Sequence, residues 1–242
     1  MVVSGSNLGV LVLHGFTGSP ASMRSLAEGF AGRGYTVEMP LLPGHGTDLA
    51  DMIPTRWDDW YGEAHAAYHR LLDQCDAVAV VGLSMGGGLT LALAEEHPEI
   101  PAIGLVNPMC MPLTAELLEG IDALLEAGLE SFESIGSDIA KPDTSELSYP
   151  GTPLEAAKSL SHGMETVEAN LGKIVSPALV LTSLQDHVVP PESAATLLAG
   201  VSGPVRQILL EQSFHVATMD FDQELVETEL FAHLAEHLGT NS

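Results

Sequence analysis

One serine, Ser84, stands between glycines in the pentapeptide GLSMG, directly after an apolar run. A serine hydroxyl attacks a carbonyl carbon when a histidine takes its proton and an acid orients that histidine. The run before Ser84 is typical of a buried strand, and the glycines after it open a helical pattern. Such a strand, turn and helix would present the hydroxyl at the top of a sheet, so we expect a nucleophile. The competing interpretation is a serine favoured only by the turn.

Candidate partners for this serine occur in the second half of the chain. The apolar run at residues 178–183 ends in LQDHVVPPESA, which places Asp186 just past a predicted strand. The run at residues 205–210 is followed by EQSFHVATMD, which places His215 just past the next one. Because the carboxyl ends of parallel strands share one edge of a sheet, we expect His215 as general base and Asp186 as orienting acid. The order serine, acid, histidine is the one that this arrangement requires.

Other residues compete for the same roles. His187 is a second candidate base, but it adjoins Asp186 and adjacent side chains diverge, which favours a role in loop structure. Asp220 and Asp222 are further candidates for the acid. They follow His215 at the start of the last predicted helix, where carboxylates interact favourably with the helix dipole. We therefore prefer Asp186.

Acyl transfer also needs hydrogen-bond donors for the oxyanion of its tetrahedral intermediate. The backbone N–H of Met85, directly after the serine, is one predicted donor. The loop HGFTG after the first predicted strand offers the backbone N–H of Phe16 as the other, and we expect the Phe16 side chain to line the substrate pocket. Met109 and Met111, which follow another strand end, are further pocket candidates because thioethers fill irregular apolar cavities; packing in the core is the alternative.

Alternating strand and helix patterns position these residues. The apolar runs are GVLVLHG, YTVEMP, AVAVVG, AIGLVNP, ALVLTS and VRQILL, and most are typical of central parallel strands. Helical spacing between them predicts an α/β fold, with a mostly parallel sheet and helices on both faces. We expect one domain over residues 1–242. The alternation breaks at about 108–171, where helical spacing over 114–136 precedes a stretch of turn formers at 137–153. An insertion after a strand end would lie over the active edge, so we expect a small helical cap.

Composition argues against several classes of partner. The 242 residues include 33 acidic and 8 basic side chains, and the formal net charge of −25 would repel nucleic acid and anionic membranes. Two cysteines, Cys75 and Cys110, are too few for a disulfide framework or a thiolate metal site. The apolar runs are too short to span a membrane. The segment MVVSGSNLG has neither a basic region nor an apolar stretch of signal-peptide length, so we expect no export signal. We expect a cytoplasmic monomer or homodimer without stable membrane association, whose partner is a small-molecule acyl ester.

Several remaining residues have ordinary structural interpretations. We expect His45, in LPGHGT, to be a loop histidine bonded to backbone groups, with substrate binding as the alternative. Trp57 and Trp60 are expected to anchor a loop on the core. His233 and His237, four residues apart near the end of the last predicted helix, would permit a metal pair, but their interaction with the helix dipole explains them. We expect neither a metal nor an organic cofactor.

Taken together, these motifs resemble the α/β-hydrolase superfamily, and within it the small bacterial carboxylesterase and monoacylglycerol lipase group. The resemblance covers nearly the whole chain and rests on HGFTGSP, LPGHGT, RWDDWY, GLSMGG, SLQDHVVPPESA and EQSFHVATMD. It implies Ser84 as nucleophile, Asp186 as acid and His215 as base. It also implies Phe16 and Met85 as oxyanion donors. The chain begins almost directly at its first core strand, so we expect most of the amino-terminal strands of the larger fold to be missing.

The sequence therefore predicts a serine carboxylic-ester hydrolase. Its substrates would be short- to medium-chain acyl esters, monoacylglycerols among them, and the reaction would pass through an acyl-enzyme. Because one triad on this fold serves several reactions, a carbon–carbon bond hydrolase or a perhydrolase is the alternative. A non-catalytic binding module of hydrolase fold is a third interpretation, which the presence of candidates for all three triad roles disfavours.

Overall fold

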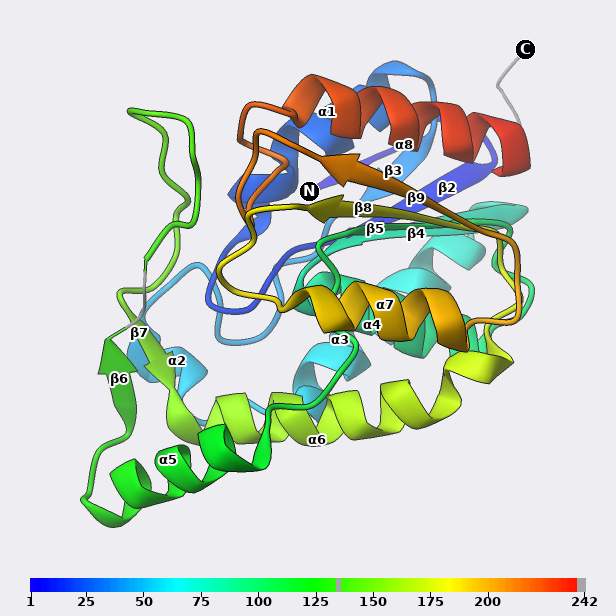
Figure 1. Cartoon of the computed structure of the whole chain (residues 1–242). Helices are drawn as coiled ribbons and strands as arrows, with labels where there is room; N and C mark the ends of the chain where they lie inside the picture. Colours follow the sequence, from blue (N-terminus) through cyan, green and yellow to red (C-terminus); the bar gives the residue numbers. More distant parts are fainter. Residues whose placement is uncertain (134–135, 239–242) are drawn as a thin grey trace.

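A seven-stranded sheet forms the centre of the molecule (Figure 1). The computed structural model describes residues 1–133 and 136–238. The strand order is β1-β3-β2-β4-β5-β8-β9. The bounds are β1 (Val2–Val3), β2 (Leu8–Leu13), β3 (Thr36–Glu38), β4 (Ala77–Leu83), β5 (Ile103–Val106), β8 (Ala178–Ser183) and β9 (Val205–Leu210). The short β1 is antiparallel to β3, and all other neighbours are parallel. The predicted α/β fold is confirmed.

Helices cover both faces of this sheet, as Figure 1 shows. On one face lie α1 (Arg24–Gly32), which follows the short helix η1 (Pro20–Met23), and α8 (Gln223–Leu238). On the other lie α3 (Trp57–Leu72), α4 (Met85–Glu96) and α7 (Pro191–Gly200). The short helix α2 (Leu49–Met52) precedes α3. Within the described part of the chain, no helix is both long and apolar enough to cross a membrane.

The two helical layers explain why the central strands are apolar on both faces. In β2, Leu11 and Leu13 belong to the core on the α3 and α4 side, whereas Val10 and Val12 belong to the core on the α1 and α8 side. The alternation of strand side chains between two faces produces this division. β9 pairs only with β8, and most of its residues are half-buried or exposed, so VRQILL forms an edge strand.

Residues 108–171 break the alternation of strand and helix. They contain α5 (Ala115–Glu126), β6 (Ser131–Glu133), β7 (Gly151–Pro153) and α6 (Leu154–Asn170), and the short helix η2 (Leu171–Lys173) follows. The helical spacing predicted over 114–136 holds only for α5, and residues 134 and 135 lie outside the described residues. The expected loop at 137–153 ends in β7, which pairs antiparallel with β6. The pairing with β6 overrides the low strand propensity of Gly151 and Pro153 in β7.

Candidate active site

Ser84 occupies a sharp turn between β4 and α4. Its backbone has φ 57° and ψ −118°, a region that L-residues other than glycine rarely adopt. Three hydrogen bonds hold this conformation: the Ser84 N–H donates to Val106 O at 3.0 Å, and the Ser84 carbonyl accepts from Gly88 N at 3.2 Å and Met109 N at 3.1 Å. The residue is 8% exposed. The surrounding structure therefore holds the serine in a strained turn at the carboxyl edge of the sheet.

Two glycines of the pentapeptide make this turn possible. A Cβ added at Gly82 would lie 2.0 Å from the Gly86 carbonyl oxygen, and one added at Gly86 would lie 2.3 Å from the Leu13 carbonyl oxygen. Both contacts are with backbone, which cannot move aside without shifting β2 or α4. Only glycine fits where β2, β4 and α4 approach so closely.

We predict that Gly86→Ala destabilises the protein by about 3 kcal/mol or more, because overpacking here displaces backbone at the serine turn. The matched control is Gly62→Ala, on α3, where an added Cβ meets nothing within 4 Å and the change should be neutral or stabilising. Urea unfolding monitored by circular dichroism measures both. Equal midpoints for the two variants would contradict the steric argument.

Asp186 and His215 meet at the same edge of the sheet. Asp186 lies in the loop after β8 and His215 in the loop after β9, and Nδ1 of His215 donates to Oδ2 of Asp186 at 2.8 Å. The other carboxylate oxygen accepts from the N–H groups of Val188 at 2.8 Å and Val189 at 2.9 Å. The side chain of His215 is 8% exposed, and that of Asp186 is 6% exposed. The bond fixes the proton on Nδ1, so Nε2 is the nitrogen left to act as a base.

A network of buried polar groups brings the His215 loop close to Ser84. Asn107 directly follows Val106, the residue whose carbonyl accepts from Ser84, and its Nδ2 donates to the His215 carbonyl at 2.7 Å. Its Oδ1 accepts from Ser183 N at 2.7 Å. Within the described residues, no hydrogen bond joins the Ser84 hydroxyl to His215. In ligand-free sites such bonds are often long and tighten only with substrate.

The competing residues have other partners. His187 donates from Nδ1 to Asp138 at 2.8 Å, which supports its predicted role in loop structure. The Asp220 carboxylate accepts from four backbone N–H groups, those of Ala140, Lys141, Phe214 and Phe221. The Asp222 carboxylate accepts from the N–H groups of Gln212 and Ser213. Both carboxylates therefore organise the loops around His215 through backbone amides, a role that the expected helix-dipole interaction did not include.

Asp138 is a residue that sequence reasoning missed. It lies in the insertion, and its Oδ2 accepts from the backbone N–H of His215 at 3.1 Å and from that of His187 at 3.2 Å. Its backbone carbonyl also accepts from Val216 N at 3.1 Å. The Asp138 side chain is only 9% exposed. A single aspartate in a polar loop carries no sequence pattern that could reveal these contacts.

We predict that Asp138→Ala lowers kcat for ester hydrolysis about 10- to 100-fold with little change in KM, because loss of these hydrogen bonds lets the His215 loop shift. Asp138→Asn, which keeps an acceptor oxygen, should recover part of the rate. Ser145→Ala, at an exposed position of the same loop, is the control. Wild-type kcat in Asp138→Ala would show that this carboxylate does not position the loop.

The two predicted oxyanion donors lie in segments that meet Ser84. Met85 is the first residue of α4, so its N–H has no carbonyl partner within the helix. Gly15, next to Phe16, lies beside Ser84: an added Cβ would be 3.4 Å from the Ser84 Cβ. The Phe16 ring packs against Trp60 at 5.5 Å and also against the small apolar cluster around Ile121 in α5.

The two methionines predicted as pocket candidates differ in their surroundings. Met109 is half-buried and its N–H bonds the Ser84 carbonyl, so its backbone lies directly at the turn. The Met111 sulfur accepts from the Thr196 hydroxyl of α7 at 3.2 Å. Both also pack against the main core cluster, so the structure is compatible with core packing and with a place in the acyl pocket.

The rings of His14 and His45 form a buried group next to the Phe16 ring. His14 is fully buried; its Nδ1 donates to Gly15 O at 3.0 Å and its Nε2 accepts from Leu42 N at 3.2 Å. Burial, and next the neighbouring His45, lower the pKa of His14 to about 3, so it stays neutral. His45 donates to Pro43 O at 3.0 Å, which bears out the predicted backbone contact, although within the described residues its Nε2 has no partner.

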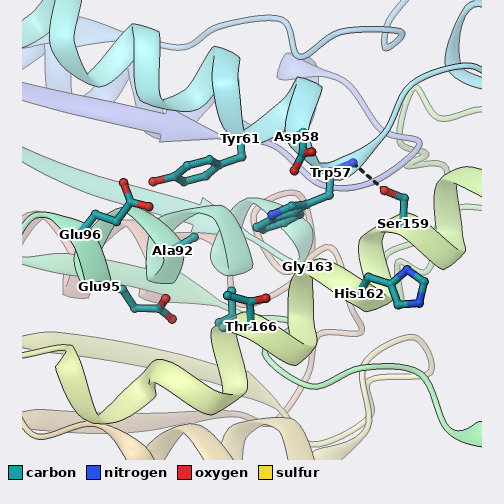
Figure 2. A pocket seen from close by; sticks show the side chains of 11 residues that line it. Trp57, Asp58, Tyr61, Ala92, Glu95, Glu96, Ser159, His162, Gly163 and Thr166 are labelled. Atoms are coloured by element: carbon teal, nitrogen blue, oxygen red, sulfur yellow. Dashed lines mark hydrogen bonds between the residues drawn. The ribbon is translucent and has the colours of Figure 1, made fainter.

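The two tryptophans have different roles. The Trp60 N–H donates to Pro43 O at 3.1 Å, which confirms that this residue anchors the LPGHGT loop. Trp57 instead packs over Gly163 of α6 and lines the pocket of about 410 Å³ shown in Figure 2. This pocket lies between α3, α4 and α6, and Ser84, Asp186 and His215 do not line it. It is therefore separate from the candidate catalytic groups.

His233, whose spacing from His237 would permit a metal pair, contacts backbone carbonyl groups through one ring nitrogen. Its Nε2 lies 3.2 Å from the Ile103 carbonyl and 3.3 Å from the Pro177 carbonyl, and the residue is buried. The nitrogen is thus already used in tying α8 to the ends of β5 and β8. The cysteines Cys75 and Cys110 are both free and buried.

Comparisons with known proteins agree with this geometry. Residues 6–222 match the family model described as serine aminopeptidase, S33. The chain is 43% identical over 236 residues to a thermostable monoacylglycerol lipase of Bacillus sp. (strain H-257), covering 96% of this chain and 92% of that one. It is 30% identical over 236 residues to a carboxylesterase of Bacillus subtilis (strain 168), covering 95% and 93%.

A solved structure is also similar over nearly its full length. It was reported for two metagenome-derived lipolytic enzymes, LipS and LipT, and it superposes with a TM-score of 0.93 at 40% identity, covering 98% of this chain and 97% of that one. The expected resemblance to the carboxylesterase and monoacylglycerol lipase group is confirmed by these matches. With its parallel sheet and its serine turn, the chain belongs to the serine aminopeptidase S33 family of α/β-hydrolases.

Proposed function

We propose that the protein is a serine carboxylic-ester hydrolase for short- to medium-chain acyl esters, with monoacylglycerols among its substrates. The observation that carries the proposal is the 2.8 Å hydrogen bond from His215 to Asp186, at the sheet edge where Ser84 stands in its strained turn. The 43% identity to a monoacylglycerol lipase over nearly the full length supports the substrate class.

In the proposed mechanism, Ser84, His215 and Asp186 act as a triad. The Ser84 oxygen attacks the ester carbonyl carbon while Nε2 of His215 takes the hydroxyl proton. The imidazolium passes that proton to the leaving alcohol as the ester C–O bond breaks, which leaves an acyl-serine. Water then attacks the acyl carbon while His215 takes its proton. The bond between the acyl carbon and the Ser84 oxygen breaks, His215 returns the proton to that oxygen, and the acid is released. Asp186 keeps Nδ1 protonated throughout and stabilises the imidazolium.

Backbone N–H groups of Met85 and Phe16 are proposed to hold the oxyanion. Both belong to segments fixed by packing, the first turn of α4 and the loop after β2, so they need no reorganisation as charge develops. Removal of one such donor typically costs about 3 kcal/mol of transition-state stabilisation. The donors are main-chain groups, which explains why a flexible methionine can occupy the position after the nucleophile.

Residues 108–171 are proposed to cap this site. Figure 1 places β6, β7 and the loop 136–150 at the end of the molecule to which the arrowheads of β8 and β9 point. The Phe16 side chain packs against the cluster of Ile121, Leu154 and Ala157, which joins the insertion to the oxyanion loop. The insertion also exposes large apolar side chains, namely Leu117, Leu129, Phe132 and Leu147. We propose that such surface receives an acyl chain and that Phe16, Met109 and Met111 line the pocket below it.

A panel of substrates tests the reaction. Nitrophenyl esters from acetyl to palmitoyl and the matching monoacylglycerols should all be assayed, and we expect the highest kcat/KM for short to medium acyl chains. Hydrolysis of a vinylogous diketone without ester hydrolysis would favour the carbon–carbon alternative. Cleavage of amino-acid nitroanilides without ester hydrolysis would favour a peptidase. Failure of a fluorophosphonate to label Ser84 would indicate a binding module.

The remaining properties rest on charge and composition. We propose that the protein works as a monomer or homodimer in the cytoplasm, without nucleic acid or stable membrane association. The net charge of −25 supports the absence of nucleic-acid binding. Sedimentation analysis at two protein concentrations measures the assembly, and a mass above that of a dimer would contradict it.

A further inference from the structure

Three histidines from two helices converge on the surface away from the candidate active site. His65 and His69 lie one turn apart on α3, and His97 directly follows the last residue of α4. One ring nitrogen of each lies within 4.8 Å of a nitrogen of the other two. We call these residues the histidine cluster. His97 lies 28 residues after His69 in the sequence, so the fold has brought two separate segments together.

The nitrogens of the first two histidines already have the spacing of metal ligands. Nε2 of His65 and Nε2 of His69 are 3.2 Å apart. Two imidazole nitrogens bound to one tetrahedral zinc ion, each at about 2.0–2.1 Å, lie about 3.3 Å from each other. The contact is a hydrogen bond between the two rings, so these two nitrogens point toward each other, and the ring centroids are 4.4 Å apart.

His97 contributes a buried nitrogen that lacks a partner. Its Nδ1 lies 3.0 Å from Oε1 of Glu99, while its Nε2 is buried and bonds to nothing within the described residues. Its ring centroid is 5.5 Å from that of His65 and 5.4 Å from that of His69. A carboxylate on one nitrogen of a histidine, with the other nitrogen free, is the arrangement that orients metal-bound histidines. A buried polar atom without a partner is costly, and a bound cation would satisfy it.

The surrounding charge also favours a cation. The carboxylates Glu96 and Glu99 adjoin the cluster, and the whole protein is strongly acidic, so the surroundings attract positive ions.

We propose that His65, His69 and His97 form a binding site for Zn²⁺ that joins α3 to the end of α4. Three imidazoles suit zinc, and a water molecule would complete the tetrahedron because the cluster is partly open to solvent. The ion would fasten the C-terminal end of the helix whose N-terminal end carries Ser84. The site takes no part in ester hydrolysis, so the proposal stands independently of the proposed function.

Titration of the full chain with Zn²⁺, after treatment with EDTA and its removal, tests the proposal by calorimetry. We expect one Zn²⁺ per chain and, at saturating Zn²⁺, a rise in Tm of about 5 °C or more. His69→Asn and His97→Asn should each weaken binding at least ten-fold, and Glu99→Gln about ten-fold. Replacement of zinc by Co²⁺ should give the visible absorption of a tetrahedral ion.

The matched control is His162→Asn, an exposed helical histidine outside the cluster, which should bind Zn²⁺ like the wild type. Equal affinity of His97→Asn and wild type would overturn the proposal, because the ion would then need only the pair on α3. Absence of saturable binding in the wild type would overturn it as well. All variants should show the same Tm in EDTA as the wild type within a few degrees, which separates loss of the site from loss of folding.

Discussion

Ser84→Ala should lower kcat for ester hydrolysis about a million-fold, the loss found when the nucleophile of a serine triad is removed. The turn that holds Ser84 is fixed by backbone hydrogen bonds: the Ser84 N–H donates to Val106 O, and the Ser84 carbonyl accepts from the N–H groups of Gly88 and Met109. All three bonds involve only the main chain, so we expect them to survive the substitution. The variant should therefore fold normally and bind substrate with a similar affinity. Single-turnover assays with a nitrophenyl ester and circular dichroism melting measure the two properties.

A fluorophosphonate provides the second measurement on this variant. It should label wild-type protein at Ser84 and should leave Ser84→Ala unlabelled. Ser145→Ala, at an exposed position, serves as the matched hydroxyl deletion and should keep full activity. Residual activity of Ser84→Ala above about one part in a thousand would refute the nucleophile assignment, because only binding and the oxyanion donors remain after its loss.

Asp186→Asn is expected to lower kcat about 10⁴-fold while leaving the geometry of the loop almost intact. The amide oxygen can still accept from the N–H groups of Val188 and Val189, which hold the other side of the carboxylate. The amide nitrogen would then face Nδ1 of His215 and donate to it. That arrangement moves the imidazole proton to Nε2, so the base can no longer take a proton from the serine.

The control for this change is Asp143→Asn, at an exposed position with φ 59°, which asparagine tolerates. It should have wild-type kcat. Nitrogen NMR shifts of His215 would report the change of tautomer in Asp186→Asn directly. If kcat fell less than ten-fold in Asp186→Asn, or fell further in Asp220→Asn, another carboxylate would be the orienting acid.

The sequence predicted the parts of the site that follow strand ends. Ser84, Asp186 and His215 each come directly after a run of apolar residues, and in a parallel sheet such positions meet at one edge. The runs were recognisable because both faces of the central strands are buried, which leaves continuous apolar segments. Local pattern and tertiary placement agree at these positions, so a single sequence was sufficient to predict that they lie at one edge of the sheet.

The parts that escaped prediction depend on contacts between distant segments. Asp138 lies in a polar loop without periodicity, and its contact with His215 exists only because the insertion folds back on the sheet. The strand β7 consists of turn-forming residues and is stabilised by its pairing with β6. In the histidine cluster, the pair on α3 has visible helical spacing, but only the packing of α4 against α3 adds His97.

The contact between Asp138 and the His215 loop has a consequence for protein engineering. Exchange of the segment 108–171 with that of a relative is an obvious route to a new substrate range. The exchange would also remove the carboxylate that bonds His215 and His187, as well as the N–H groups of Ala140 and Lys141 that bond Asp220. We therefore expect substrate specificity and turnover to be coupled in this chain, and we expect a productive chimera to need residues 137–141.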